Sequence, residues 1–200
     1  NSGSHALASC ATGYLYSGLH RVSDGWIFRE WAPNATCIYL IGTCNGWQKD
    51  PAYKLNNIGS GVWEIFIPEH ALHHGDLYKL WIEWNGGAGE RIPAWCRRVV
   101  QDTESKIFSA QVWNPSVPYV FKNKKFVPSK TPLLIYECHI GMSTSKETVG
   151  SYTEFRENVL PRIYKAGYNA IQIMAIQEHP YYGSFGYHVS SFFAASSRFG

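Results

Sequence analysis

The distribution of tryptophan divides the sequence into two parts. All eight tryptophans lie between Trp26 and Trp113, and none occurs in the remaining residues. The tryptophan-rich part also holds short β-branched and aromatic runs that end at turn signals: GWIFREW, CIYLIG, VWEIFIP, LYKLWIEW and IFSAQVW. Short runs separated by turns are typical of two antiparallel sheets packed face to face. We therefore predict an all-β sandwich, immunoglobulin-like in class, over residues 14–118.

Composition and charge limit the kinds of partner that we expect. Hydrophobic residues make up 45% and charged residues 16% of the chain, which is typical of a folded globular protein. The net charge is +3 and the basic residues are spread out, so we expect no nucleic-acid partner. No apolar stretch reaches the length of a membrane span and no signal peptide opens the sequence, so we expect no membrane partner.

The cysteines favour a reducing compartment. There are five, an odd number, and no two of them form a CxxC pair. This pattern disfavours both a disulfide framework and a zinc ribbon. We therefore expect a cytoplasmic protein.

A boundary follows the sandwich. Residues 114–132 contain four prolines and a lysine cluster, Lys122, Lys124 and Lys125, which are typical of a solvated linker. We place the linker itself at residues 119–132.

Beyond the linker the pattern changes to strand, helix and strand. LLIYECHIG and AIQIMAI are apolar runs, and SYTEFRENVLPRIYKAGY between them has helical spacing. Ser151 with Glu154 predicts an N-terminal capping box, Pro161 a kink or restart, and Gly167 the end of the helix. We predict a parallel β-α-β unit, whose near-continuous apolar strand is of the kind found in sheets that are covered on both faces. Two strands and one helix cannot bury this much apolar surface alone, so residues 133–200 are expected to begin a larger, incomplete α/β domain.

Three stretches resemble a known enzyme family. They are IYECHIGM, NVLPRIYKAGYNAIQIMAIQEHPYYGSFGYHVSSFFAASSRFG and GWIFREWAPNATCIYLIGTCNGWQ. They are similar to 1,4-α-glucan (glycogen) branching enzymes of the α-amylase superfamily, over roughly residues 14–200. The resemblance implies a starch-binding β-sandwich module followed by the first β-α-β unit of a TIM-type (β/α)8 barrel. One departure is Cys44, where the module more often has Phe.

The resemblance also implies a chemistry. The family cleaves α-1,4-glucan with retention and transfers the chain to a glucan 6-hydroxyl, which makes the α-1,6 branches of glycogen. Its catalytic carboxylates lie on later barrel strands, so we expect no catalytic residue, no metal and no other cofactor within these 200 residues. The expected partner is an α-glucan, such as glycogen or amylose. The chain alone is expected to be the inactive N-terminal part of the enzyme.

Two other functions remain open at this stage. A non-catalytic glucan-binding or scaffold protein fits a chain without catalytic carboxylates, although the β-α-β unit argues against it. A debranching enzyme or another hydrolase of the superfamily is disfavoured by the EHPYYGSFGYH block.

Candidate substrate-binding residues follow the second apolar run. Barrel active sites form at the carboxyl ends of the strands, where Glu178, His179 and Tyr187 lie. The resemblance implies that Tyr187 stacks under the glucose next to the cleaved bond, and Gly186 before it allows close approach. Support of neighbouring loops is the favoured alternative for Glu178 and His179. Phe192 and Phe193 are expected to pack in the core.

Candidate glucan-binding residues of the sandwich are Trp47, Lys79 and Trp84. Trp47 could stack on a sugar ring, because aromatic faces pack against the apolar faces of sugars. Lys79 and Trp84 match positions near the glucan-binding face of related modules. The alternative is that most of the eight tryptophans belong to the core.

Two further groups of residues give little support for a metal site or a hydrolase site. Glu137 and His139 alternate along the first apolar run and, with His188, lack the spacing of a metal site. Ser184 lacks the strand–turn–helix context of a hydrolase nucleophile.

Overall fold

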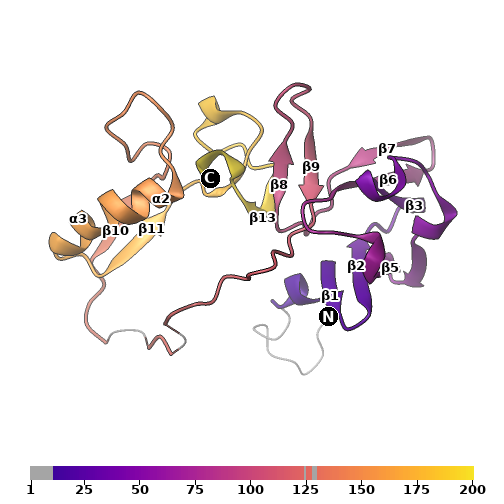
Figure 1. Cartoon of the computed structure of the whole chain (residues 1–200), viewed down its shortest axis with the longest axis horizontal. Coiled ribbons are helices and arrows are strands. Elements are labelled where there is room, and N and C mark those ends of the chain that lie inside the picture. The colour runs from indigo at the N-terminus through magenta and orange to yellow at the C-terminus, as the bar shows by residue number, and fades with distance from the viewer. Residues whose placement is uncertain (1–10, 124, 128–129) are drawn as a thin grey trace. The chain divides into compact units, whose positions relative to one another are not determined.

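The chain divides into two compact units. The computed structural model describes residues 11–123, 125–127 and 130–200 (Figure 1). Unit 1 comprises the chain up to Pro115 together with Ser191–Ala194, and unit 2 comprises 116–190 and 195–200. The expectations about Cys10, about Lys124 and about linker positions 128 and 129 lie outside the described residues.

Unit 1 is built from two antiparallel sheets. The first has the strand order β1-β2-β5-β4, and the second has the order β3-β6-β9-β8 with β7 paired to β6. The strands are β1 (Gly18–Val22), β2 (Gly25–Trp31), β3 (Ala35–Gly42), β4 (Asn56–Gly59), β5 (Val62–Pro68), β6 (Leu77–Trp84), β7 (Gly87–Arg91), β8 (Val99–Gln101) and β9 (Phe108–Gln111).

The two sheets share one hydrophobic core. Successive side chains of a strand point to opposite faces, so every second residue of β2 and β5 is buried. Phe28 of the first sheet meets Tyr78 of the second edge to face, with ring centroids 6.2 Å apart. Burial of apolar area from both sheets stabilises the layers against each other. The predicted sandwich is confirmed.

The tryptophans are less buried than expected. Trp26 and Trp63 belong to the buried core, whereas Trp31, Trp47 and Trp113 are exposed and the rest are half-buried. The period of two along a strand explains this, because Trp26 and Trp31 of β2 have opposite sequence parity and point to opposite faces. The alternative that most of the eight tryptophans belong to the core therefore does not hold.

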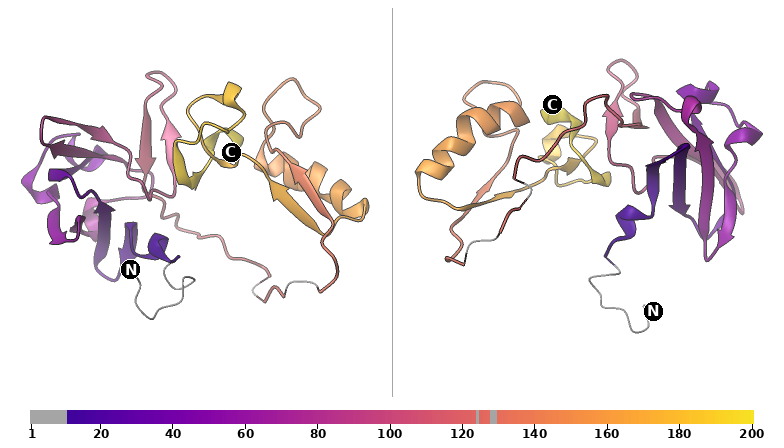
Figure 2. Two further views of the ribbon diagram at one scale, coloured as in Figure 1. Left: turned by 180° about the vertical axis from the view of Figure 1, so that it is seen from behind. Right: turned by 60° about the horizontal axis from the view of Figure 1, so that its bottom comes forward.

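Unit 2 contains a parallel β-α-β unit. Strand β10 (Ile135–Cys138) pairs in parallel with β11 (Ala170–Ile173). The helical segment between them consists of α2 (Tyr152–Glu154), a π-helical turn (Phe155–Val159) and α3 (Leu160–Lys165). Figure 2 shows from two sides that this segment lies along the strand pair, and its buried residues share a cluster with Cys138 and Ile173.

The helix signals act where they were expected. The Ser151 side chain caps α2 by accepting a hydrogen bond from the Glu154 N–H, with an oxygen-to-nitrogen distance of 3.0 Å. The Glu154 carboxylate accepts from the Thr144 hydroxyl at 3.2 Å, so the Ser151 half of the predicted capping box is the part that forms. Pro161 is the second residue of α3 and follows the π turn directly, where its missing N–H interrupts the regular hydrogen-bond pattern. The helix therefore restarts at Leu160 after the π turn, as the sequence predicts.

The strand pair of unit 2 keeps an uncovered apolar surface. Ile135, Tyr136 and Ile171 are exposed, in agreement with the expectation that this unit cannot bury its apolar surface alone. Two parallel strands with one helix offer too few neighbours to cover both faces.

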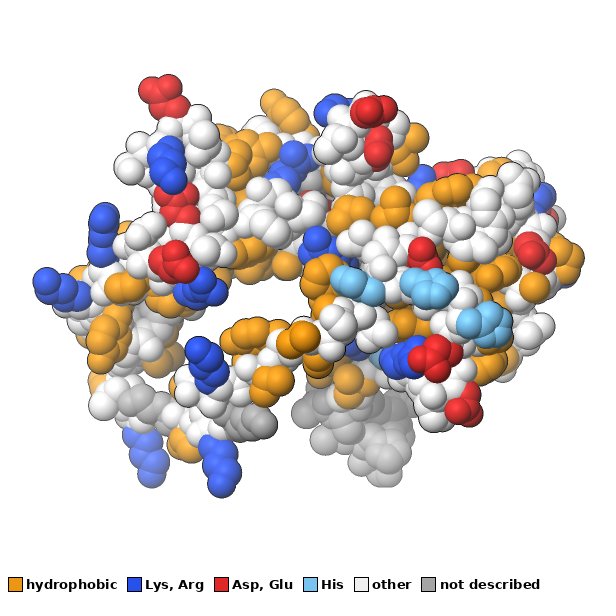
Figure 3. All heavy atoms as spheres, in the orientation of Figure 1, with side chains coloured by type: hydrophobic (Ala, Val, Ile, Leu, Met, Phe, Trp, Pro, Cys, Tyr) orange, Lys and Arg blue, Asp and Glu red, His pale blue; other side chains and the backbone are white. Residues whose placement is uncertain are grey.

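Short elements complete the chain. They are β12 (Gln177–Glu178), β13 (Ser191–Ala195), and the 3-10 turns Gly13–Leu15, Thr43–Asn45, Pro51–Tyr53, Glu69–Ala71, Tyr182–Ser184 and Ser197–Phe199. Among the residues described, no helix has the length and apolarity needed to cross a membrane. On the face in Figure 3, basic and acidic side chains are interspersed.

Candidate functional site

A hydrogen-bonded turn after β3 positions Trp47. The Asn45 side chain accepts from the Gly42 N–H at 2.9 Å and donates to the Leu40 carbonyl at 2.9 Å. The Trp47 N–H donates to the Gly42 carbonyl at 2.8 Å, which closes the turn. Cys44, the departure from the family pattern, packs half-buried against the core, where burial raises the pKa of its thiol. The turn therefore forms with Cys at this position.

The backbone at Trp47 is strained. Its φ is 63°, in the left-handed region that bulky residues avoid, and Gly46 before it has φ 60°. Strain of this kind persists only where surrounding contacts hold it and is frequent at functional sites. It turns the indole of Trp47 out of the sheet, leaving it 38% exposed.

Lys79 of β6 lies beside this indole. Its ammonium nitrogen is 5.7 Å from the Trp47 ring centroid and 2.7 Å from a carboxylate oxygen of Glu90. The lysine is 8% exposed, so its stem is packed and its head is held in one place. An aromatic face with a fixed donor and acceptor beside it suits a hydroxylated ring ligand.

Trp47 and Lys79 both line a cavity of about 360 Å³. It is lined by Trp47, Leu77, Lys79, Glu90, Asp102, Ser105, Ile107 and Ser109. Sequence reasoning missed the residues from the loop between β8 and β9. The Asp-Thr-Glu-Ser turn beginning at Asp102 was the available signal, since Asp side chains often organise such turns. There the N–H and hydroxyl of Ser105 donate to the Asp102 carboxylate and lower its pKa.

Trp84 lies apart from this cavity. It ends β6, and the Arg91 guanidinium of β7 stands 5.1 Å from its ring centroid. A Cβ added at Gly87 would come within 3.1 Å of the indole, so Trp84 packs over the β6–β7 hairpin. The structure thus brings Trp47 and Lys79 together, while Trp84 does not line the same cavity.

In unit 2, Glu178 is a fully buried acceptor. Its carboxylate accepts from the Ser197 N–H at 2.8 Å, the His179 N–H at 3.0 Å and the Ser196 hydroxyl at 3.3 Å. Its own carbonyl accepts from the Ser190 N–H at 2.9 Å. These bonds tie the chain after β12 to the chain after β13. These hydrogen bonds indicate that Glu178 stabilises the neighbouring loops.

The two buried histidines of unit 2 also bond to backbone. The Nδ1–H of His179 donates to the Gln177 carbonyl at 3.1 Å, and its buried Nε2 has no partner among the described residues. The Nε2–H of His139 donates to the Phe185 carbonyl at 2.9 Å. His139 thereby holds the loop that leads to Tyr187.

Tyr187 is an exposed ring on a constrained loop. It is 67% exposed, and its hydroxyl makes only a weak contact with the Met174 sulfur at 3.3 Å. A Cβ at Gly186 would lie 2.5 Å from the Ala175 carbonyl oxygen, so this glycine accommodates backbone. Phe192 is 71% exposed, so its expected place in the core is wrong; Phe193 is also exposed and stacks on Trp95 at 4.3 Å.

The residues of the other constellations stay apart. No group of three His, Cys, Asp or Glu side chains that could hold a metal ion occurs in the described part of the chain. Glu137 accepts a hydrogen bond from Gln172 on the neighbouring strand at 3.1 Å. The Ser184 hydroxyl donates to the Tyr181 carbonyl at 2.7 Å within a turn.

Comparison with known proteins gives consistent matches. Residues 17–96 match the family Carbohydrate-binding module 48 (Isoamylase N-terminal domain). The chain is 46% identical over 98% of its length to a 1,4-alpha-glucan-branching enzyme of Dictyostelium discoideum, and 44% identical over 97% to that of Yarrowia lipolytica. In both cases it spans 29% of the relative's length.

A solved structure with the same fold is the catalytic module of the glycogen-degrading pneumococcal virulence factor SpuA. The TM-score is 0.72 at 17% identity, covering 92% of this chain and 32% of that one. Over nearly its whole length the chain is homologous to part of the 1,4-alpha-glucan-branching enzymes, and residues 17–96 of it match carbohydrate-binding module 48.

Proposed function

We propose that this chain is the N-terminal part of a glucan branching enzyme and that its sandwich holds α-glucan on Trp47 and Lys79. The observation that carries the binding role is the position of the Lys79 ammonium, 5.7 Å from the Trp47 ring centroid beside a cavity. A sugar ring stacks on the indole, while Lys79 and Glu90 bond its hydroxyls. In this proposal Trp84 makes a peripheral contact with the glucan, outside this cavity.

The branching reaction belongs to the whole protein. A retaining glycosyl transfer needs a nucleophilic carboxylate and an acid/base carboxyl on opposite sides of the scissile bond. We place these groups in the part of the protein outside this chain, as the 29% coverage of the relatives allows. In this proposal residues 14–118 are the module, 119–132 the linker and 133–200 the first β-α-β unit of the barrel.

The parallel pair β10–β11 supports the barrel assignment. Its uncovered residues Ile135, Tyr136 and Ile171 are the surface that further strands and helices of a barrel would cover. Glu178 and His179 then support the loop after the second barrel strand, and Tyr187 on that loop contacts the sugar.

Titration of the 200-residue chain with maltoheptaose in a calorimeter tests glucan binding. Trp47→Ala should weaken binding by about tenfold, since an aromatic–sugar contact contributes on the order of 1.5 kcal/mol. Lys79→Gln should weaken it as well. Phe66→Ala is the matched control, because Phe66 is an exposed aromatic residue that does not line the cavity. Equal affinity of the Trp47 and Phe66 variants would refute the assignment.

A second assay separates the enzyme from a scaffold. The full-length protein, incubated with amylose, should form new α-1,6 linkages that appear after enzymatic debranching and chain-length analysis. The 200-residue chain should bind glucan and form none. A full-length protein that binds amylose without adding branches would favour the scaffold function instead.

A further inference from the structure

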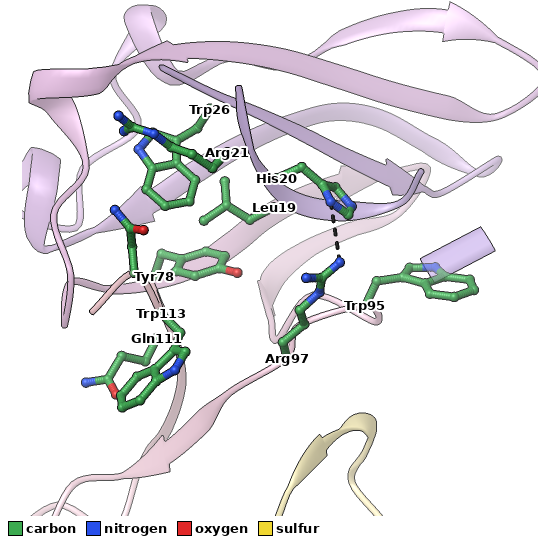
Figure 4. Close-up of a pocket in the computed structure, with 10 residues that line it drawn as sticks. Leu19, His20, Arg21, Trp26, Tyr78, Trp95, Arg97, Gln111 and Trp113 are labelled. Carbon is green, nitrogen blue, oxygen red and sulfur yellow. Dashed lines mark hydrogen bonds between the residues drawn. The ribbon is translucent and has the colours of Figure 1, made fainter. Parts of the chain in front are cut away.

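A second cavity of unit 1 has a different chemical lining. It has a volume of about 290 Å³ and shares no lining residue with the Trp47 cavity. This volume lies at the lower end of the range for small-molecule sites, which suits a ligand of one ring with its substituents. The cavity is lined by Leu19, His20, Arg21, Trp26, Tyr78, Trp95, Arg97, Gln111, Trp113 and Asn114 (Figure 4).

The guanidinium of Arg97, which lines this cavity, makes only long hydrogen bonds in the described part of the chain. It donates to the Tyr14 carbonyl at 3.3 Å and to the His20 Nδ1 at 3.5 Å, both long contacts. The Nε2–H of His20 donates to the Ser17 carbonyl at 2.8 Å, so its Nδ1 is the acceptor that faces the arginine. Among the described residues no carboxylate lies within ion-pair distance of Arg97. Its charge is therefore available to an anion.

Two further donors belong to this lining. The Tyr78 side chain is 2% exposed, and its hydroxyl points into the cavity between Leu19 and Arg97 (Figure 4). Burial raises the pKa of this phenol, so it stays a protonated donor. The Trp26 Nε1–H is buried and lacks a partner in the described part of the chain. Buried donors without acceptors are costly, and a ligand that supplies acceptor oxygens relieves this cost.

The acceptors around the cavity are already used. The Gln111 side-chain oxygen accepts from Arg98 at 2.8 Å, and its nitrogen donates to the Gly75 carbonyl at 3.1 Å. Arg21 forms an ion pair with Glu69. The buried Glu30 carboxylate, whose charge acts on Tyr78, already accepts from two backbone N–H groups. The charged group left to a ligand among these residues is therefore the Arg97 guanidinium, which favours an anion with several oxygens.

We propose that this cavity binds the phosphoryl group of a sugar phosphate, with Arg97 as its principal ligand. Guanidinium groups match phosphate oxygens bidentately, and the Tyr78 hydroxyl adds a neutral donor to the same group. Trp113, an exposed indole at the rim, offers apolar surface to the attached sugar. This site lies within the module and does not depend on branching activity.

Calorimetric titration of the 200-residue chain in phosphate-free buffer tests the proposal with three probes: inorganic phosphate, glucose 6-phosphate and glucose. Glucose 6-phosphate should bind, inorganic phosphate should bind more weakly, and glucose should not bind measurably at this site. Equal affinity for the first two probes would support phosphoryl recognition but assign free phosphate as the ligand. Glucose binding as tight as glucose 6-phosphate, or no binding of either phosphate, would overturn the proposal.

Variants identify the site. Arg97→Gln should weaken glucose 6-phosphate binding by about tenfold or more, because hydrogen bonds to charged groups are strong. Arg97→Lys should recover part of the affinity. Lys54→Gln is the matched control, since it removes one exposed positive charge away from this cavity. If Lys54→Gln lost as much affinity for glucose 6-phosphate as Arg97→Gln, net charge alone would explain the loss and the proposal would be overturned.

Tyr78→Phe guards against a folding artefact of the arginine variant. It removes only the hydroxyl and keeps the ring that packs on Phe28. The variant should keep the melting temperature within a few degrees and lower glucose 6-phosphate affinity by several-fold. Unchanged affinity in both Tyr78→Phe and Arg97→Gln would place the phosphate elsewhere.

Discussion

The buried carboxylate of Glu30 accepts a hydrogen bond from the backbone N–H of Ala94 at 2.9 Å, which joins two segments distant in the sequence. Its second oxygen accepts from the Trp31 N–H at 3.0 Å. The contact ties β2 to the segment that carries Trp95 and Arg97 into the proposed phosphoryl site. The position of these two residues thus depends on a charged group in the core.

Glu30→Gln should destabilise unit 1 by about 1–3 kcal/mol. The two carboxylate oxygens accept from two different N–H groups, and an amide can offer an oxygen to only one of them. Its NH2 group would face a backbone donor. Urea denaturation followed by tryptophan fluorescence measures the change, with the exposed Glu104→Gln as control. A loss of unfolding free energy below about 0.5 kcal/mol, as expected of an exposed site, would contradict the claim that Glu30 holds the two segments together.

The same residue predicts a pH dependence. Burial raises the pKa of Glu30 above its ordinary value of 4.5, although both backbone hydrogen bonds oppose the shift. The folded state therefore binds this proton more tightly than the unfolded state. The stability of the wild-type chain minus that of Glu30→Gln should fall as the pH rises from about 4.5 through the raised pKa, and level off above it. A difference that rises with pH would show a lowered pKa.

Gly42→Ala should damage both the turn before Trp47 and glucan binding. A Cβ at this position would lie 2.2 Å from the Leu77 carbonyl oxygen, so backbone must move, at a cost of about 1–3 kcal/mol. Gly89→Ala is the matched control in a strand, where the nearest atom is the flexible end of Arg91 at 3.2 Å. Thermal unfolding and maltoheptaose titration of both variants check the prediction. Equal behaviour of the two variants would contradict it.

Glu178→Gln should loosen the loop between β12 and the end of the chain. The buried carboxylate loses at least one acceptor bond and its charge, which should cost about 1–3 kcal/mol locally. Amide hydrogen exchange should accelerate at Ser197, whose N–H donates to this carboxylate at 2.8 Å. Glu147→Gln, at an exposed site, should leave exchange unchanged. Unaltered protection at Ser197 would remove the proposed supporting role.

Tyr187→Ala in the full-length protein should cut the branching rate by at least about tenfold with little change in melting temperature. An exposed ring contributes little to packing, whereas a stacked sugar contact is worth on the order of 1.5 kcal/mol. Tyr187→Phe should be milder because the ring face survives. Phe192→Ala serves as the exposed control. If that control lost turnover without unfolding while Tyr187→Ala kept it, the sugar contact would belong to Phe192.

Local chemistry explains what could be predicted from the sequence. Strands such as Gly25–Trp31 and Val62–Pro68 follow from alternation of buried and exposed residues, and their bounds match the quoted runs. The cap at Ser151 and the restart near Pro161 depend on one or two side chains and the backbone beside them. These features were predictable because each is decided within a few residues.

The short strands β4 and β8 were missed for a related reason. Asn56–Gly59 has no apolar alternation, and Val99–Gln101 has only three residues. Both form because a longer neighbour, β5 or β9, supplies the hydrogen-bonding edge. Pairing with a partner strand overrides weak local preference.

The candidate sites were only partly predictable. The sequence indicated Trp47 and Lys79 separately, through the family resemblance, but not the loop of Asp102 and Ser105 that completes their cavity. The sequence by itself determined the longer strands, the turns and the family resemblance, since these depend on neighbouring residues and their order. Tertiary structure alone decided which side chains share a cavity, because packing the two sheets brings together residues such as Trp26 of β2 and Tyr78 of β6.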